Sequence, residues 1–203
     1  MVARAGLVAL VALAAVVWAA DLIRHGWSIT GSFFSPISLV VTVLAGVLVA
    51  FDQTAWSWPG VRSLAKRKDL RGTWRGTIAS NWARPETGTG IAPIEAYLVV
   101  RQTFSTLHLR LLTVEAQSMT LVATLVAETD GTCMVAAIYR GEPRLAVRDR
   151  SAIHHGGMLL RVDAAGRSLA GSYWTDRRTH GELEFHFLSR ELAGDFEGAR
   201  LMA

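Results

Sequence analysis

Cysteine is almost absent from this sequence. Its 203 residues include a single cysteine, Cys133, so the chain cannot form a disulfide within itself. Such a chain suits a reducing compartment. Cys133 begins the apolar run 133–137, and a lone cysteine followed by small apolar residues is typical of a packed strand. A reactive thiol needs surroundings that lower its pKa, so we expect Cys133 to belong to a core.

The excess of positive over negative charge is also small. The chain has 21 Lys and Arg residues against 17 Asp and Glu residues, which gives a formal net charge of +4. Many of the positive charges are scattered arginines, whereas proteins that bind nucleic acid polymers usually gather Lys and Arg into a patch or stripe. The composition therefore does not favour a nucleic acid polymer as a partner.

The usual catalytic motifs are missing. The sequence has no Ser-His-Asp order, no P-loop and no convincing pair of catalytic carboxylates. His154 and His155 are adjacent, so in a strand they point to opposite faces and cannot ligate one metal together. We therefore expect no enzymatic activity, no metal and no cofactor. His155 precedes two glycines, and we expect it to shape a pocket wall or a bulge.

Long hydrophobic runs are concentrated in the first 58 residues. Segments 6–20 and 33–51 contain no charged residue and are joined by a short polar turn. A bilayer core takes about 20 apolar residues per helix. The runs predict a two-helix transmembrane hairpin over 1–58, followed by a basic juxtamembrane linker over 59–68. A cleaved signal peptide at the first run is the alternative.

Basic residues indicate an orientation for this hairpin. The connecting loop holds Arg24 and the opposing Asp21. The residues that follow the second run include Arg62, Lys66, Arg67, Lys68 and Arg71. Because loops rich in Lys and Arg stay on the cytoplasmic side, we expect a multi-pass protein with both termini and the following domain in the cytoplasm.

The second run also carries small residues four positions apart, at Thr42, Gly46 and Ala50. Such a stripe lets two helices approach closely. Its partner is either the alanine-rich first run of the same chain or a helix of another subunit, and both alternatives stay open.

From Asp69 onward the helical periodicity disappears. Apolar residues alternate or form short runs, which are broken by turn signals such as 130–131 (Asp-Gly). The candidate strands are 72–82, 94–104, 107–113, 119–127, 133–140, 152–163, 168–175 and 181–188. This spacing predicts an all-β domain over 69–192, an eight-stranded antiparallel up-and-down, lipocalin-like β-barrel. We expect the C-terminal tail, 193–203, to be poorly ordered.

The first candidate strand indicates which residues point inward. Alternation places Trp74, Gly76, Ile78, Ser80 and Trp82 on one face. We expect this face to line the barrel interior, with the tryptophan filling it and the glycine placed where the strand coils.

Three segments together resemble one known family. They are 70–76 (LRGTWRG) after the apolar hairpin, 154–160 (HHGGMLL) and 169–181 (LAGSYWTDRRTHG). Their order and spacing are similar to those of the CBASS antiphage effectors of bacteria that join two transmembrane helices to a cyclic-oligonucleotide-sensing β-barrel, the CD-NTase-associated membrane β-barrel family. The resemblance covers nearly the whole chain, from about residue 6 to residue 188.

The resemblance implies a function. In this family a CD-NTase encoded by a neighbouring gene makes a cyclic di- or trinucleotide on infection. The barrel binds it, the effector forms a homo-oligomer, and the helices disrupt the bacterial inner membrane, so that the infected cell dies before phage are released. This chain departs from the pattern because Trp174 stands beside Tyr173 where one aromatic residue is usual, and which of the two faces the ligand stays open.

The candidate ligand-binding residues combine aromatic rings with hydrogen-bond donors. Stacking on an aromatic ring is worth about 1–3 kcal/mol per base, and phosphates are bound by Arg, Thr or Ser donors. The predicted residues are Tyr139, Tyr173, Trp174, Thr175, Arg177, Arg178 and Thr179.

Two other functions remain as alternatives. A membrane-tethered, lipocalin-like carrier of an apolar small molecule would have a dry apolar interior, and a membrane enzyme would have a hydrolytic site in the barrel. A cyclic-nucleotide receptor instead predicts a polar mouth lined by Arg and Thr, which the segment 177–179 favours.

Overall fold

The computed structural model describes residues 15–16, 19–20, 23–24, 35–65, 67–83, 87–127 and 132–203. The chain divides into two compact units, Met1–Arg67 and Lys68–Ala203, which are described separately. Most of the first apolar run and the loop that follows it lie outside the described residues.

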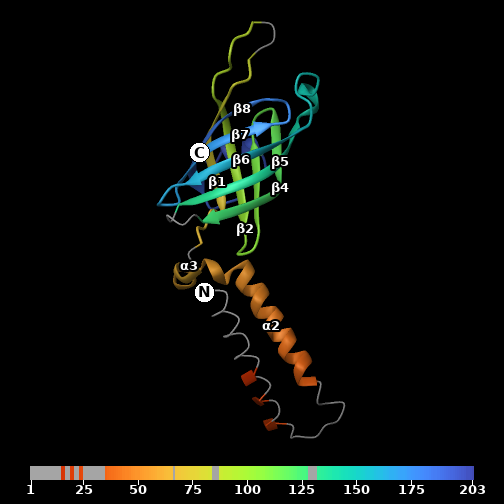
Figure 1. The fold of residues 1–203 in the computed structure, drawn as a ribbon, viewed down its shortest axis with the longest axis vertical. Helices are drawn as coiled ribbons and strands as arrows, with labels where there is room; N and C mark the ends of the chain where they lie inside the picture. Colours follow the sequence, from red (N-terminus) through yellow and green to blue (C-terminus); the bar gives the residue numbers. More distant parts are fainter. Residues whose placement is uncertain are drawn as a thin grey trace. The chain divides into compact units, whose positions relative to one another are not determined.

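The described part of the first unit is helical. Helix α2 spans Ser35–Gln53, the 3₁₀ turn η2 spans Ala55–Ser57, and helix α3 spans Pro59–Ala65 (Figure 1). The carbonyl of Ala50 near the end of α2 accepts both from the backbone N–H of Thr54, at 3.1 Å, and from the Thr54 hydroxyl, at 3.0 Å. Gly46 has space beside it, because a Cβ atom added there would meet nothing within 4 Å.

The prediction of an N-terminal two-helix transmembrane hairpin is wrong for this structure. Among the residues described, none of the helices combines the length and the apolar character needed to cross a membrane. Helix α2 spans 19 described residues, and its last two, Asp52 and Gln53, are polar, so the described apolar stretch is shorter than the about 20 residues that a bilayer core takes.

The second unit is the predicted barrel. Its eight strands form a closed antiparallel sheet in the order β1 to β8, with β8 paired to β1 (Figure 1). The strands are β1 Gly72–Ser80, β2 Ile94–Gln102, β3 Leu107–Leu112, β4 Ala116–Ala127, β5 Cys133–Pro143, β6 His154–Val162, β7 Ser168–Thr175 and β8 His180–Ser189. The prediction of eight up-and-down strands is therefore confirmed, although β4 begins at Ala116 rather than at residue 119.

The barrel interior holds the expected face of β1. Trp74 is fully buried and Ile78 is buried beside it in the main core, which also contains Cys133. The ring of Trp74 meets Phe187 edge to face, with centroids 5.4 Å apart. Gly76 has no side chain because a Cβ atom there would lie 1.8 Å from the carbonyl oxygen of Glu184 on β8. Strand alternation therefore placed this face correctly.

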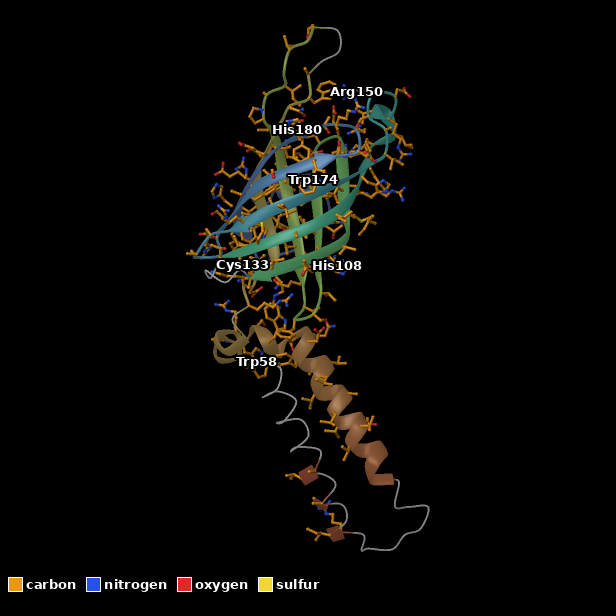
Figure 2. All side chains as sticks on the ribbon, viewed as in Figure 1. Trp58, His108, Cys133, Arg150, Trp174 and His180 are labelled. Atoms are coloured by element: carbon orange, nitrogen blue, oxygen red, sulfur yellow. The ribbon has the colours of Figure 1, made fainter. Side chains whose placement is uncertain are left out.

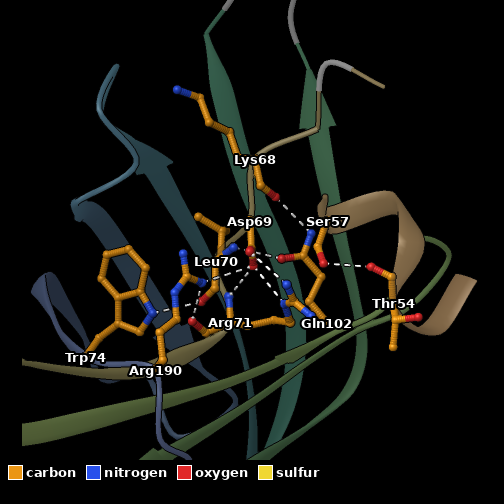
Figure 3. A network of polar contacts seen from close by, with 9 residues as sticks. All are labelled: Thr54, Ser57, Lys68, Asp69, Leu70, Arg71, Trp74, Gln102 and Arg190. Atoms are coloured by element: carbon orange, nitrogen blue, oxygen red, sulfur yellow. Dashed lines mark hydrogen bonds and ion pairs between the residues drawn. The ribbon is translucent and has the colours of Figure 1, made fainter. Parts of the chain in front are cut away.

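Polar contacts close one end of the barrel around the segment that enters β1 (Figure 3). The indole Nε1 of Trp74 donates to the carbonyl of Leu70 at 2.9 Å, and Leu70 itself is fully buried. The side-chain amide of Gln102 accepts from the backbone N–H of Leu70 and donates to the carbonyl of Lys68, both at 2.9 Å. These bonds satisfy backbone groups that would otherwise be buried without a partner.

Asp69 completes this closed end. Its carboxylate accepts two hydrogen bonds from the Arg71 guanidinium at 2.9 Å and lies 3.2 Å from Arg190. Burial by itself would raise the pKa of Asp69, but the Arg71 hydrogen bonds and the Arg190 charge outweigh it and hold the pKa below its ordinary value. The ionised carboxylate therefore ties the entry segment to the chain beyond β8.

The C-terminal tail is ordered, contrary to expectation. Residues Phe196–Arg200 form helix α4, and the carboxylate of Asp195 caps it by accepting from the N–H of Gly198 at 2.7 Å. Phe196 packs edge to face on Tyr97, with centroids 5.3 Å apart. The outer face of β2 carries buried apolar residues at Tyr97 and Val99, and the tail covers that face.

Replacing Trp74 with alanine tests the importance of this core. We expect Trp74→Ala to lower the free energy of unfolding by about 3–5 kcal/mol, because a large cavity forms in the interior. The control is Trp174→Ala, which removes a tryptophan that is 49% exposed and should cost about 1 kcal/mol or less. Chemical unfolding followed by circular dichroism measures both, and equal losses would contradict this description of the core.

Candidate ligand-binding cavity

A cavity of about 620 Å³ lies inside the barrel, at the end opposite the closed one. Its walls come from the end of β1, at Ile78 and Ser80, from inward-facing residues of the other strands, and from the connections between them. Figure 2 shows Arg150, which lines it, at this end of the barrel and Cys133 at the other. The volume falls within the about 300–1,000 Å³ of sites that bind small molecules.

Two tyrosine rings project into this cavity from neighbouring parts of the sheet. Tyr139 on β5 is 4% exposed, and burial raises the pKa of its hydroxyl, which keeps the ring neutral. Tyr173 on β7 donates its hydroxyl proton to the Oγ of Ser80 at 2.7 Å. The rest of the inner wall is apolar, with Met158 and Leu183 among its residues. The cavity therefore offers the partly exposed ring of Tyr173 and a mostly buried Tyr139 over an apolar floor.

Glycines make room for the rings at this end. A Cβ atom on Gly156 would lie 2.5 Å from the hydroxyl oxygen of Tyr139, and one on Gly141 would lie 2.5 Å from the ring of His154. Tyr139 and His154 in turn meet edge to face, with centroids 6.4 Å apart. Gly156 on β6 therefore leaves the space that the Tyr139 ring occupies, and Gly141 on β5 leaves the space that the His154 ring occupies.

The turn between β7 and β8 forms one side of the mouth. The hydroxyls of Thr175 and Thr179 share a hydrogen bond of 2.7 Å, and Arg178 adopts a left-handed conformation with φ of 62°. The Arg177 guanidinium donates to the Oγ of Ser151 at 2.9 Å and to the carbonyl of Ala152 at 3.4 Å. Both of these partners are neutral, so they leave the Arg177 charge available for an anion.

The connection between β5 and β6 forms the other side. It contains the 3₁₀ turn η3, Leu145–Val147, and Arg150, which forms an ion pair with Glu115 from the β3–β4 turn. Ser151 and His154 also line the cavity here. The mouth thus gathers charged and hydroxyl-bearing side chains above the apolar interior.

His154 is a neutral hydrogen-bonding group in this wall. Its Nδ1 lies 3.1 Å from the carbonyl of Ala152, and because a carbonyl can only accept, the proton is on Nδ1. Burial lowers the pKa of His154, and the Arg177 charge acts in the same direction, while the Ala152 hydrogen bond and Asp176 oppose them. The Nε2 atom is therefore an acceptor.

The structure brings five of the seven predicted site residues together. The lining residues are Tyr139, Tyr173, Thr175, Arg177 and Thr179. Trp174 and Arg178 are not among the residues that line the cavity. Trp174 alternates with Tyr173, so its ring lies on the outer wall, where it covers Gly157. Tyr173 is therefore the aromatic residue of this pair that faces the cavity.

Sequence reasoning chose the wrong histidine for the pocket wall. His155 lies on the outer face, 3.7 Å from the carboxylate of Asp176, whereas His154 lines the cavity. The sequence contained the information needed for the correct assignment. Met158 and Leu160 are apolar and face inward, and because side chains alternate along a strand, His154 lies on the same inner face. Arg150, Ser151 and Glu115 were also missed, since they belong to connections whose path no strand pattern predicts. Within the described ranges, no group of three metal-ligating side chains forms.

Comparison with known proteins gives one finding. A family model described as Cap15, cyclic dinucleotide receptor domain, matches residues 65–186, which is more than half of the chain and includes the barrel through most of β8. All the residues that line the cavity lie within this match. No curated protein matches the chain.

The pKa of His154 predicts a pH effect on stability. The folded state binds a proton at His154 less readily than the unfolded state, so this residue should make the fold less stable as pH falls below the unfolded value of about 6.5. We expect the loss of unfolding free energy between pH 7.5 and pH 5.5 to be smaller in His154→Gln than in the parent. Denaturant titrations at both pH values measure it, and parallel losses would contradict the assignment.

Proposed function

The chain belongs to the Cap15 cyclic dinucleotide receptor domain family, and from this we propose that its barrel cavity binds a cyclic di- or trinucleotide made by a CD-NTase. The protein is then a receptor rather than an enzyme, and an effector of a CBASS antiphage system.

The observation that carries this proposal is the position of Tyr139, Tyr173 and Arg177 around one cavity. A cyclic dinucleotide presents two base faces and two phosphates. The partly exposed ring of Tyr173 offers a surface for a base, at about 1–3 kcal/mol per stacked base, whereas Tyr139, which is 4% exposed, contributes to the cavity wall. The guanidinium of Arg177 and the hydroxyls of Thr175 and Thr179 are suited to phosphate oxygens.

The mouth of the cavity favours this ligand over an apolar one. Arg150, Arg177 and Glu115 all line it. A carrier of apolar molecules gains nothing from charged groups at its entrance, because burying them against an apolar ligand costs free energy. The apolar floor formed by Met158 and Leu183 is equally compatible with the faces of nucleobases.

Two adjacent arginines provide a matched test of binding. We expect Arg177→Ala to weaken binding of the cyclic nucleotide by about 1.5–3 kcal/mol, or about 10- to 150-fold, because a charged hydrogen bond is lost. Arg178→Ala removes the same side chain one position away, outside the cavity, and should change affinity about twofold or less. Calorimetry of the purified chain against cyclic di-AMP, cyclic di-GMP, cyclic GMP–AMP and cyclic tri-AMP measures both variants.

Two outcomes would count against the proposal. If the folded parent binds none of these nucleotides but takes up an apolar probe, the carrier function is favoured. If the two arginine variants lose affinity equally, the ligand is held outside the cavity.

We also propose an output at the bacterial inner membrane, with the barrel on the cytoplasmic side where the nucleotide is made. Ligand binding favours a homo-oligomer, and the assembled N-terminal units then disrupt the membrane. The side chains of α2 support contact with lipid, because Val41, Leu48 and Val49 are 59%, 50% and 60% exposed. Exposed apolar surface of this kind commonly marks a protein or membrane contact.

A charge placed on α2 tests this output. We expect Leu48→Lys to abolish nucleotide-dependent dye release from liposomes of inner-membrane lipids, because a lysine in an apolar contact must be desolvated. Nucleotide affinity should stay within about twofold of the parent, since the barrel is unchanged. Gln53→Lys, which adds the same charge at the polar end of α2, is the control and should release dye like the parent. Full release by Leu48→Lys would contradict a role for α2.

A further inference from the structure

Strand β4 has a long edge without a strand partner. Of its 12 residues, only three, Gln117 to Met119, are in register with β3. Beyond a bulge between Thr120 and Val122, β4 pairs regularly with β5 from Val122 to Ala127, but in the described residues no register with β3 accompanies these six pairs. The side-chain oxygen of Thr120 accepts from the N–H of Leu109 at 3.0 Å, where the ladder ends.

This edge lacks the usual protection. Free edges in soluble proteins usually carry charged residues or proline, which prevent pairing with another chain. Strand β4 contains neither along its whole length. Instead it exposes large apolar side chains, with Leu121 59%, Val122 64% and Val126 39% exposed. An uncharged strand with exposed apolar residues and an open edge is suited to receive another strand.

We propose that this edge, Val122–Ala127, is where a second copy of the chain docks, with the two β4 strands pairing antiparallel across a twofold axis. A twofold axis brings the residue at its centre against its own equivalent, so a charge at that position would repel itself. The segment has no charge to repel, and a centre near Thr124 places Val122 against Val126 of the second copy. The edge is therefore complementary to itself.

The outer wall next to this edge extends the contact. Ile138 on β5 lies beside Val122 in the sheet and is 56% exposed, and Gly157 and Trp174 continue the same row across β6 and β7. Arg140 and Glu142, which pair at 3.1 Å, lie toward one side of this row. An apolar centre with a polar rim is the usual arrangement of a protein interface.

The small size of this edge indicates an interface that does not form by itself but needs a further contribution, such as ligand binding. Six paired residues extend only about 20 Å along a single strand. The area that one such strand pair buries is small beside the about 800 Å² per partner of a stable complex. The cavity shares the same strand, because Ala116 and Ser118 at the start of β4 line it. A ligand that favours the strand geometry of the paired state would therefore promote dimer formation through its differential affinity.

This inference rests on the proposed function for the ligand and for assembly, and a charge exchange at Thr124 tests it. The full chain, in detergent, is prepared with two different affinity tags as Thr124→Lys and as Thr124→Glu. Co-purification of the two tags is measured with and without the cyclic nucleotide that binds best in calorimetry. Ser172→Lys is the control, because it adds the same charge to an exposed outer position of β7, a strand paired on both edges.

We expect each Thr124 variant to bind the nucleotide with parental affinity but to lose ligand-dependent co-purification with itself by about tenfold or more, through repulsion of like charges. Mixing the Lys and Glu variants should restore it, and Ser172→Lys should behave like the parent. Parental self-association of either variant, or no recovery in the mixture, would overturn the docking site while leaving nucleotide binding in place.

Failure of the proposed function has a different signature. If the parent binds none of the nucleotides tested, the receptor function is wrong. Co-purification of the Thr124→Lys and Thr124→Glu variants is then measured without ligand at high protein concentration. Association that the Thr124 charges do not change, or no association at any concentration, would overturn the docking site in that case.

Discussion

The hydrogen bond from the Trp74 indole to the Leu70 carbonyl determines which end of the barrel is available. It allows a tryptophan to lie wholly inside the sheet without a buried N–H that has no partner. The same bond draws the chain that enters β1 across the barrel end, where Gln102 and Asp69 hold it. With one end filled, the remaining interior space lies at the other end, and the polar connections around that end form the walls of a cavity.

The two faces of the strands have separate tasks. Tyr173 faces the cavity and Trp174, the next residue, covers Gly157 on the outer wall. In the same way His154 lines the cavity while His155 lies near Asp176 outside. One set of alternate residues therefore faces the cavity, and the other set forms the outer surface of the barrel. Strand β4 belongs to both, since its first residues line the cavity and its last residues form an open edge.

Electrostatics in the cavity follow from burial. The apolar interior keeps Tyr139 and His154 neutral, whereas the guanidinium of Arg177 at the mouth donates to the Ser151 hydroxyl and the Ala152 carbonyl, which are both neutral. A ligand with flat apolar faces and anionic groups fits this division, with its bases toward the interior and its phosphates toward the mouth. Gly141 and Gly156 are needed for this arrangement, because any side chain at either position would displace a ring that forms the cavity wall.

The barrel could be predicted from residue patterns, because eight short alternating segments separated by turn signals have few other ways to bury their apolar faces. The same patterns also indicated the inner face of β1 and five of the residues that line the cavity, since these lie on strands or in a short hairpin. The tertiary structure alone decided the rest. A run of apolar residues does not by itself give the length of a helix, and in the described part of the chain none of the helices is long and apolar enough to cross a membrane, so the predicted hairpin was wrong. The order of the tail depends on the outer face of β2, which it covers. Arg150 and Glu115 meet across two connections far apart in the sequence. Among the described residues, the edge of β4 is open because β4 continues to Ala127, past the start of β3 at Leu107, and its register with β3 stops at Met119. Such contacts depend on strand register and loop path, which local residue patterns do not specify.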